Sequence, residues 1–360
     1  MLQCQPWLKA SQLKIALAYK KFHLIIDRYS ERRVFLAIDH LMNTFVPASG
    51  GGILQTIIGS QFPGKPEFSP KKTSHTIYLD VDVRSIAFEI DAIDKEKPTI
   101  LLAHGMGGCS ESGYIKRISA KLVSQGYGVI LINQRGSGLG MGLSPSLWNG
   151  GSSEDLARMI DYFLQRHPHL LLIGFSLSGN ILLKYLGEGR SIPSGLIGAM
   201  AVNPPVDLRV ASHIISTHRS CWLFNRYYMR LIGNQVRALK KNFPNPIDPD
   251  LSTIWNFDAS YTAPAGGYKN LDDYYDQCSS KHYLKNIETM TSILCSKDDP
   301  FVPPEVFTNV LMNSQVSIYQ PQGGGHMGYI SRHRTPHGDR RWMDFVILEW
   351  VREMSERRIS

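Results

Sequence analysis

The chain has 360 residues, of which 43% are hydrophobic and 19% charged, and its formal net charge at pH 7 is +8. This balance is typical of a globular protein with a large core, and the length allows one large domain with insertions or two domains. The five cysteines are scattered without a C-x-x-C pair, so we expect no disulfide framework and no metal site. The sequence has neither zinc-knuckle spacing nor an RNA-binding motif, so we expect no nucleic-acid partner despite the positive charge, and we expect no cofactor.

Residues 1–46 form a first region, in which apolar residues recur at helical spacing among many lysines and arginines. This pattern predicts a basic amphipathic helical segment. We favour helices packed on the main domain, and the alternative is peripheral contact with a membrane surface. The chain start lacks the apolar core of a signal peptide, and no apolar run approaches the roughly 20 residues of a membrane span, so we expect a cytoplasmic protein. A glycine-rich stretch, 47–52, then marks the start of the main domain, 47–360.

From residue 76 onward, short apolar runs alternate with helical patterns. Strands at 76–79 and 86–90 are expected to pair antiparallel, and a later helix to begin with a capping box of Ser152 and Asp155. Alternating strands and helices predict an α/β fold, with a mostly parallel central sheet covered by helices on both faces and an active site at the carboxyl ends of the strands. The other expected strands are 99–103, 128–133, 169–174, 196–202, 290–295 and 316–320, and the expected helices are 114–124 and 152–165.

Two segments at strand ends suggest where an oxyanion would be bound. The segment HGMGG, residues 104–108, follows the strand at 99–103, and the first loop at this edge of such a sheet can supply an N–H group to an oxyanion hole. We assign the two donors to the backbone N–H groups of Met106 and of Leu177, the residue after Ser176, which is the candidate nucleophile described next. His104 is expected to hold its loop, and Arg135 to brace neighbouring loops.

The segment 170–180, LLLIGFSLSGN, predicts a strand, a sharp turn and a helix, with Ser176 at the tip of the turn. This is the layout of a nucleophile elbow, in which the positions two before and two after the serine must be small. The usual pattern is G-x-S-x-G, and here Ser178 replaces the second glycine. The alternative interpretation is an ordinary turn between a buried strand and a helix.

Residues from about 204 to 285 interrupt the alternation and are rich in tyrosine and tryptophan. They predict a mainly helical cap insertion that lies over the carboxyl edge of the sheet. Aromatic side chains in the cap would either line an acyl or aryl pocket or form the insertion's own core.

A serine nucleophile needs a base to take its proton, and the base needs an acid to orient it. In the α/β-hydrolase fold the order along the chain is serine, acid, histidine. Asp298 and Asp299 follow the strand at 290–295 in a proline-bounded turn, and we choose Asp299 as the acid with Asp298 in reserve. His326 is the predicted base, because it follows the last strand in a glycine-rich loop, QGGGHMG.

Taken together, these motifs resemble the YheT-like (EMB8) group of α/β-hydrolases, which includes the abhydrolase-domain proteins one, two and three. The resemblance implies a nucleophile at Ser176, an acid at Asp299 and a base at His326, in an esterase, lipase or phospholipase. It begins near residue 50, and it does not explain the basic segment before residue 46. It is carried by LQTI at 54–57, HGMGGCSESGYIKRISAKL, QRGSG, GGSSEDL, GFSLSGN, FDASYTAPAGGYKNLDDYYDQCSS, SKDDPFVPPE and GGGHMGY.

The sequence therefore predicts a serine hydrolase that cleaves carboxylic esters, either of lipids or of short-to-medium acyl chains, through an acyl-enzyme. Acyl transfer to an alcohol or amine on the same triad is one alternative. A non-catalytic α/β-hydrolase scaffold that binds lipid or protein is another. A dehalogenase or an epoxide hydrolase is excluded, because each needs a carboxylate at the tip of the elbow.

Overall fold

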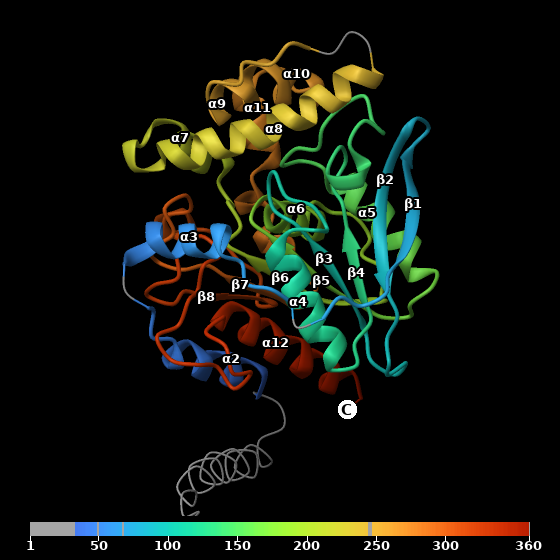
Figure 1. The fold of residues 1–360 in the computed structure, drawn as a ribbon, viewed down its shortest axis with the longest axis vertical. Helices are drawn as coiled ribbons and strands as arrows, with labels where there is room; N and C mark the ends of the chain where they lie inside the picture. Colours follow the sequence, from blue (N-terminus) through green and yellow to red (C-terminus); the bar gives the residue numbers. More distant parts are fainter. Residues whose placement is uncertain (1–32, 49, 67, 244–246, 360) are drawn as a thin grey trace, which may run out of the picture. The chain divides into compact units, whose positions relative to one another are not determined.

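The computed structural model describes residues 33–48, 50–66, 68–243 and 247–359. Its centre is an eight-stranded sheet in the order β1-β2-β4-β3-β5-β6-β7-β8 (Figure 1). The pairs β1–β2 and β2–β4 are antiparallel and all other neighbours are parallel, which confirms the predicted α/β fold. The strands are β1 (Thr73–Asp80), β2 (Val83–Ile90), β3 (Thr99–Ala103), β4 (Val129–Ile132), β5 (Leu170–Phe175), β6 (Leu196–Val202), β7 (Thr291–Leu294) and β8 (Val316–Tyr319).

Helices cover both faces of the sheet (Figure 1). Helices α4 and α12 pack together on one face, and α5 and α6 pack together on the other. The chain between β6 and β7 forms the helices α7 to α11, with a π-helical turn at Asp258–Thr262. The helices of this unit are α3 (Gly51–Gln61), α4 (Gly113–Ser124), α5 (Ser153–Leu164), α6 (Leu177–Gly187), α7 (Leu208–Thr217), α8 (Trp222–Asn242), α9 (Ile254–Phe257), α10 (Ala263–Ala265), α11 (Leu271–Cys278) and α12 (Trp342–Ile359).

The N-terminal region is a separate unit that ends at Thr44, and the unit that contains the sheet begins at Phe45. In the N-terminal unit the structure describes one helix, α2 (Arg33–Thr44). Residues 1–32, which carry most of the predicted basic amphipathic segment, lie outside the described residues. Of the helices within the described ranges, none is both long enough and apolar enough to span a bilayer.

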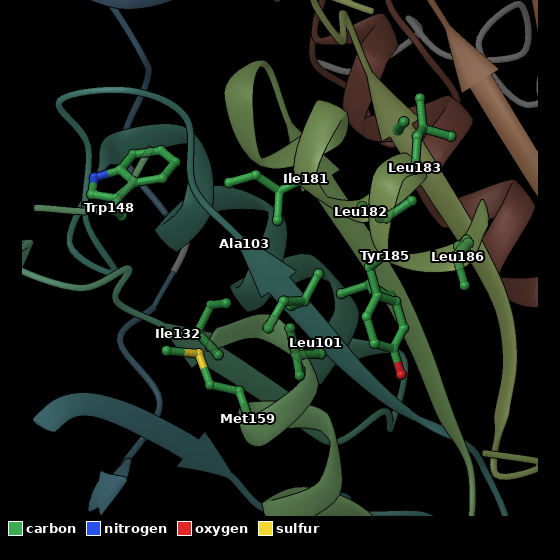
Figure 2. Close-up of a cluster of buried hydrophobic side chains, with 14 of the residues drawn as sticks. Leu101, Ala103, Ile132, Trp148, Met159, Ile181, Leu182, Leu183, Tyr185 and Leu186 are labelled. Carbon is green, nitrogen blue, oxygen red and sulfur yellow. The ribbon is translucent and has the colours of Figure 1, made fainter. Parts of the chain in front are cut away.

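The core lies where the central strands meet α5 and α6 (Figure 2). Every residue of β3 and of β4 is buried, as expected for parallel strands that are covered on both faces. Leu101 and Ile132 from these strands cluster with Met159 of α5 and with Ile181 and Tyr185 of α6, and all five are at most 2% exposed. Each such side chain contributes roughly 1.5–3 kcal/mol on burial, so this cluster anchors α5 and α6 on the central strands.

One local prediction is wrong. The Ser152 side chain does not cap α5, and its Oγ accepts a hydrogen bond from the Asn149 N–H group instead. Asp155 does not complete a capping box either, because its carboxylate binds the Arg135 guanidinium through two hydrogen bonds, one from Nε at 2.8 Å. Arg135 also donates to Ser146 Oγ at 3.1 Å, so it braces loops as expected. The ion pair with a distant arginine competes successfully with a local cap.

Candidate active site

Ser176 lies in the turn between β5 and α6, at φ 51° and ψ −121°. A positive φ is strained for a residue with a side chain, so the turn must be held by its surroundings. The Ser176 N–H group donates to the Val202 carbonyl at 2.8 Å, and the Ser176 carbonyl accepts from the Gly179 N–H group at 2.8 Å. A Cβ atom at position 174 would lie 2.6 Å from the Ser178 carbonyl oxygen, so the tight turn requires glycine there.

Ser178, the departure from the G-x-S-x-G pattern, has a structural function. Its side chain is 1% exposed. The Ser178 hydroxyl donates to the His104 carbonyl at 2.5 Å and accepts from Gln134 Nε2 at 2.9 Å. Because His104 and Gln134 follow β3 and β4 respectively, this one hydroxyl ties the turn after β5 to the ends of two neighbouring strands.

The imidazole of His104 holds its own loop. Its Nδ1 lies 2.8 Å from the Gly105 carbonyl oxygen, and its Nε2 lies 3.1 Å from the Gln134 backbone nitrogen. Burial lowers the pKa of His104 to about 4, since the charged imidazolium would be desolvated. The ring is therefore neutral at pH 7, donating through Nδ1 and accepting through Nε2. This agrees with the expectation that His104 positions the loop.

The structure brings Ser176, His326 and Asp299 together, although they come from three separate loops. His326 Nε2 lies 2.8 Å from Ser176 Oγ, and His326 Nδ1 lies 2.8 Å from Asp299 Oδ2. The other carboxylate oxygen, Asp299 Oδ1, accepts from the Phe301 and Val302 N–H groups at 2.8 and 3.1 Å. Asp299 and His326 are 6% and 7% exposed, so water competes little for these contacts. A hydroxyl, an imidazole and a carboxylate in this order can generate a nucleophilic serine.

Asp298, the reserve acid, has a different position. Its Oδ1 accepts the N–H group of Gly325 at 2.8 Å, one residue before the candidate base. In the part of the chain that the structure describes, no hydrogen bond joins Asp298 to His326. The two adjacent aspartates thus hold the same loop at two points, Asp299 through the imidazole and Asp298 through the backbone.

Asn203 is a site residue that the sequence analysis missed. It directly follows β6 at φ 48°, and it is fully buried. Asn203 Nδ2 donates to Asp299 Oδ2 at 2.6 Å and to the Gly325 carbonyl at 3.2 Å, and Asn203 Oδ1 accepts from the Met327 N–H group at 3.3 Å. Its position directly after a buried strand was the available signal, because such residues lie at the same edge of the sheet as the elbow.

Helix α3 holds the His326 loop from the other side. Thr56 Oγ1 accepts the His326 N–H group at 2.8 Å. The Gln55 side chain accepts from the Ile330 N–H group at 2.7 Å and donates to the Ile330 carbonyl at 3.1 Å. A Cβ atom at Gly325 would lie 2.2 Å from the Gly52 carbonyl oxygen, so the loop and the helix approach closely. The segment 54–57 was noted in the sequence, but its contact with the loop was not predicted.

The residues of the two candidate oxyanion donors line the same cavity as Ser176. Leu177 is the first residue of α6, and Met106 lies in the loop after β3. Both residues line a cavity that also includes Ser176 and His326. Among the described residues, neither the Met106 nor the Leu177 N–H group has a hydrogen-bond acceptor, so both remain available to an anion. The loop can approach because residue 105 is glycine, whose added Cβ would lie 3.1 Å from Ser176 Cβ.

Two cavities meet at Ser176 and His326. The larger, of about 480 Å³, extends between α3 and α8, and the smaller, of about 80 Å³, extends under the cap towards Asp258. Within the described residues, no group of three or more His, Cys, Asp or Glu side chains is arranged to hold a metal ion. Four residues line both cavities, namely Met106, Ser176, Tyr228 and His326.

Comparison with known proteins gives a consistent result. A family model described as the alpha/beta hydrolase fold matches residues 98–332. The chain is 28% identical over 266 residues to the monoacylglycerol lipase of Saccharomyces cerevisiae, covering 69% of this chain but only 58% of that protein. It is 28% identical over 322 residues to the protein YheT of Escherichia coli, covering 85% of this chain and 92% of YheT, which confirms the predicted YheT-like resemblance. The fold is shared with a Pyrococcus furiosus esterase, at a TM-score of 0.51 and 15% identity over 79% of this chain and 92% of the esterase.

Proposed function

The chain belongs to the α/β-hydrolase fold family, and from this premise we propose that it is a serine hydrolase that cleaves the carboxylic esters of lipids. The observation that carries the proposal is the unbroken set of hydrogen bonds from Ser176 Oγ through His326 to Asp299, each 2.8 Å long. It lies where two cavities meet, beside two backbone N–H groups without acceptors among the described residues. A non-catalytic scaffold that only binds a ligand would not need the buried Asp299 carboxylate hydrogen-bonded to His326.

In the first half of the reaction, Ser176 Oγ attacks the ester carbonyl carbon while His326 Nε2 takes the hydroxyl proton. Asp299 keeps the His326 Nδ1–H group in place and stabilises the imidazolium. The negative charge that develops on the carbonyl oxygen is bound by the Met106 and Leu177 N–H groups, and loss of one such donor costs roughly 3 kcal/mol. The tetrahedral intermediate collapses to an acyl-serine, and His326 Nε2–H returns the proton to the leaving alcohol.

In the second half, a water molecule replaces the alcohol. His326 Nε2 removes one of its protons as the water oxygen attacks the acyl carbon, and the same two N–H groups bind the oxyanion again. Breakdown of this intermediate releases the carboxylic acid, and the proton returns to Ser176 Oγ. The net reaction is hydrolysis of the ester, without any cofactor.

A lipid ester is favoured because the larger cavity is mainly apolar. Residues from α3 and α8 form its walls, among them Ile57, Phe224, Tyr228 and Leu231, and its volume of about 480 Å³ is that of an ordinary ligand pocket. An acyl chain in this cavity would bury its methylene groups against these side chains. The yeast relative is named a monoacylglycerol lipase, which is compatible with such a substrate.

The test is a panel of esters of increasing acyl length, hydrolysed by the wild-type chain and by Ser176→Ala. We expect at least a thousandfold loss of kcat/KM in the variant, with unchanged thermal unfolding. Ser124→Ala, which removes an exposed hydroxyl at the end of α4, is the matched control and should retain full activity. Retention of more than about a tenth of the activity by Ser176→Ala would remove Ser176 from the mechanism.

A further inference from the structure

Helix α8 exposes large apolar side chains beside the mouth of the larger cavity. Trp222 is 58% exposed, Leu223 63% and Tyr227 42%. The helix nevertheless has a well-packed side. Its opposite face buries Phe224, Met229, Ile232, Val236 and Leu239. Leu223 and Tyr227 belong to the cavity lining, so the exposed apolar surface is continuous with the path to Ser176. Contiguous exposed apolar surface of this kind marks a binding surface.

The same face of α8 is basic and contains no acidic residue. Arg226 and Arg230 are exposed between and beside the aromatic residues, and the sequence from 222 to 242 has no aspartate or glutamate. In the described chain, no acidic side chain pairs with either arginine. The Arg226 guanidinium lies 5.6 Å from the centre of the Trp222 ring. A cavity of about 850 Å³ adjoins this face, and its lining includes Arg219, Trp222 and Arg226.

The opposite lip of the cavity also carries an exposed aromatic side chain. Gln61 and Pro63, at and just after the end of α3, line the larger cavity, and Phe62 between them is 67% exposed. Apolar side chains therefore project into solvent from both sides of the entrance. Exposed apolar side chains on two sides of one cavity entrance mark a candidate binding surface.

We propose that the exposed face of α8, defined here as Trp222, Leu223, Arg226, Tyr227 and Arg230, docks on a lipid bilayer that carries anionic headgroups. Aromatic side chains are favoured at the level of lipid headgroups, and cations without neighbouring acids are attracted to an anionic membrane surface. The arginines would attract the anionic lipids, and the aromatic side chains would enter the headgroup region. The proposal extends the proposed function, because a docked protein would have its cavity entrance directly on the lipid substrate. Binding to the bilayer can be measured without ester hydrolysis, so the two proposals can be tested separately.

The experiment is flotation of the full-length chain with phosphatidylcholine vesicles, with and without about 30% phosphatidylserine. The variant combines Trp222→Gln, Arg226→Gln and Arg230→Gln, none of which lines the larger cavity. The matched control combines Leu311→Gln, Arg332→Gln and Arg340→Gln, which removes one exposed apolar side chain and two exposed charges elsewhere. All proteins carry Ser176→Ala, so that substrate turnover cannot alter the vesicles.

We expect the parent protein and the control to bind the anionic vesicles and the docking-face variant to bind at least tenfold more weakly, since each arginine near an anionic surface is worth about fivefold. Binding should weaken without phosphatidylserine and at high salt. Equal binding by the docking-face variant, or no binding by the parent, would overturn the proposal. In the active protein, the docking-face variant should hydrolyse a water-soluble ester at the parental rate. A protein that docks but hydrolyses no ester would contradict the proposed function and leave the docking surface intact.

Discussion

Asn203 and His326 donate to the same atom, Asp299 Oδ2, from distances of 2.6 and 2.8 Å. Asn203 thereby fixes the oxygen that orients the candidate base, and it also binds the backbone on both sides of His326. The residue adopts a left-handed conformation, at φ 48°, which asparagine tolerates better than most residues. In the proposed mechanism Asn203 would be a positioning residue, since its side chain contacts Asp299 and the loop around His326.

Replacing Asn203 by alanine should lower kcat by about tenfold to a hundredfold. The lost hydrogen bond to a charged group is worth about 1.5–3 kcal/mol, and each 1.4 kcal/mol in the barrier is about tenfold in rate. Steady-state kinetics would measure the effect, with KM nearly unchanged. Asn309→Ala is the control, because Asn309 is also left-handed, at φ 62°, but lies exposed. An equal loss in both variants would assign the effect to backbone strain.

Thr56→Val should also lower kcat, by removing the acceptor of the His326 N–H group without changing the size of the side chain. Thr56 is 3% exposed, so no water can replace its Oγ1, and a buried N–H group would be left unpaired at a cost of about 1–3 kcal/mol. Thr56→Ser restores the oxygen and should restore most of the activity. If serine rescues no better than valine, the role of Thr56 is packing alone.

Ser178→Gly, which recreates the usual G-x-S-x-G pattern, should destabilise this protein. It leaves the His104 carbonyl and Gln134 Nε2 without their partner, and it places glycine inside α6. We expect the free energy of unfolding to fall by about 2 kcal/mol in urea titrations. Ser124→Gly is the control, because it also replaces a helical serine and its local hydrogen bond, but at the exposed end of α4. An unchanged midpoint for Ser178→Gly would show that the three-loop connection is dispensable.

The ionisation of Asp258 makes the free energy of unfolding depend on pH. It lies buried against the smaller cavity, where Tyr275 OH donates to its Oδ2 at 3.0 Å, and burial raises its pKa from 3.8 to about 6. Because the unfolded state loses this proton more readily, the folded state loses stability as the pH rises from about 4 to 6, and the loss is complete above pH 6. A rise of this size corresponds to about 3 kcal/mol.

Asp258→Asn removes this titration and keeps the shape of the side chain. The difference in unfolding free energy between the variant and the wild type should therefore shift in favour of the variant between pH 4 and pH 7. Urea unfolding at several pH values measures it. Asp248→Asn, at an exposed residue outside both cavities, is the matched control. A flat difference for Asp258→Asn would mean that the carboxylate is already charged at pH 4.

Local patterns were sufficient to predict the strands and the turn that hold the candidate site. Buried parallel strands appear as short apolar runs, and the small residues at 174 and 178 around Ser176 reflect a turn that tolerates no bulk. His326 could be chosen because glycines surround it after a strand. Each of these signals lies within about ten residues of the group that it concerns, so the sequence displays it directly.

The contacts that hold the site together could not be predicted, because their partners are far apart in the chain. Thr56 meets His326 from a position 270 residues away, and Asn203 meets Asp299 from 96 residues away. Neither partner has a local pattern that specifies the other. The capping box at Ser152 failed for the same reason, since a distant side chain, Arg135, binds Asp155 more strongly than the local N–H groups do.

The most direct test of the central claim is to label the protein with a fluorophosphonate and locate the adduct by peptide mass spectrometry. Such a probe reacts with an activated serine and not with an ordinary one. We predict a single adduct at Ser176 in the wild type, at least a hundredfold slower labelling in His326→Gln, and undiminished labelling in Ser124→Ala. Absence of an adduct at Ser176, or labelling that does not depend on His326, would contradict the account.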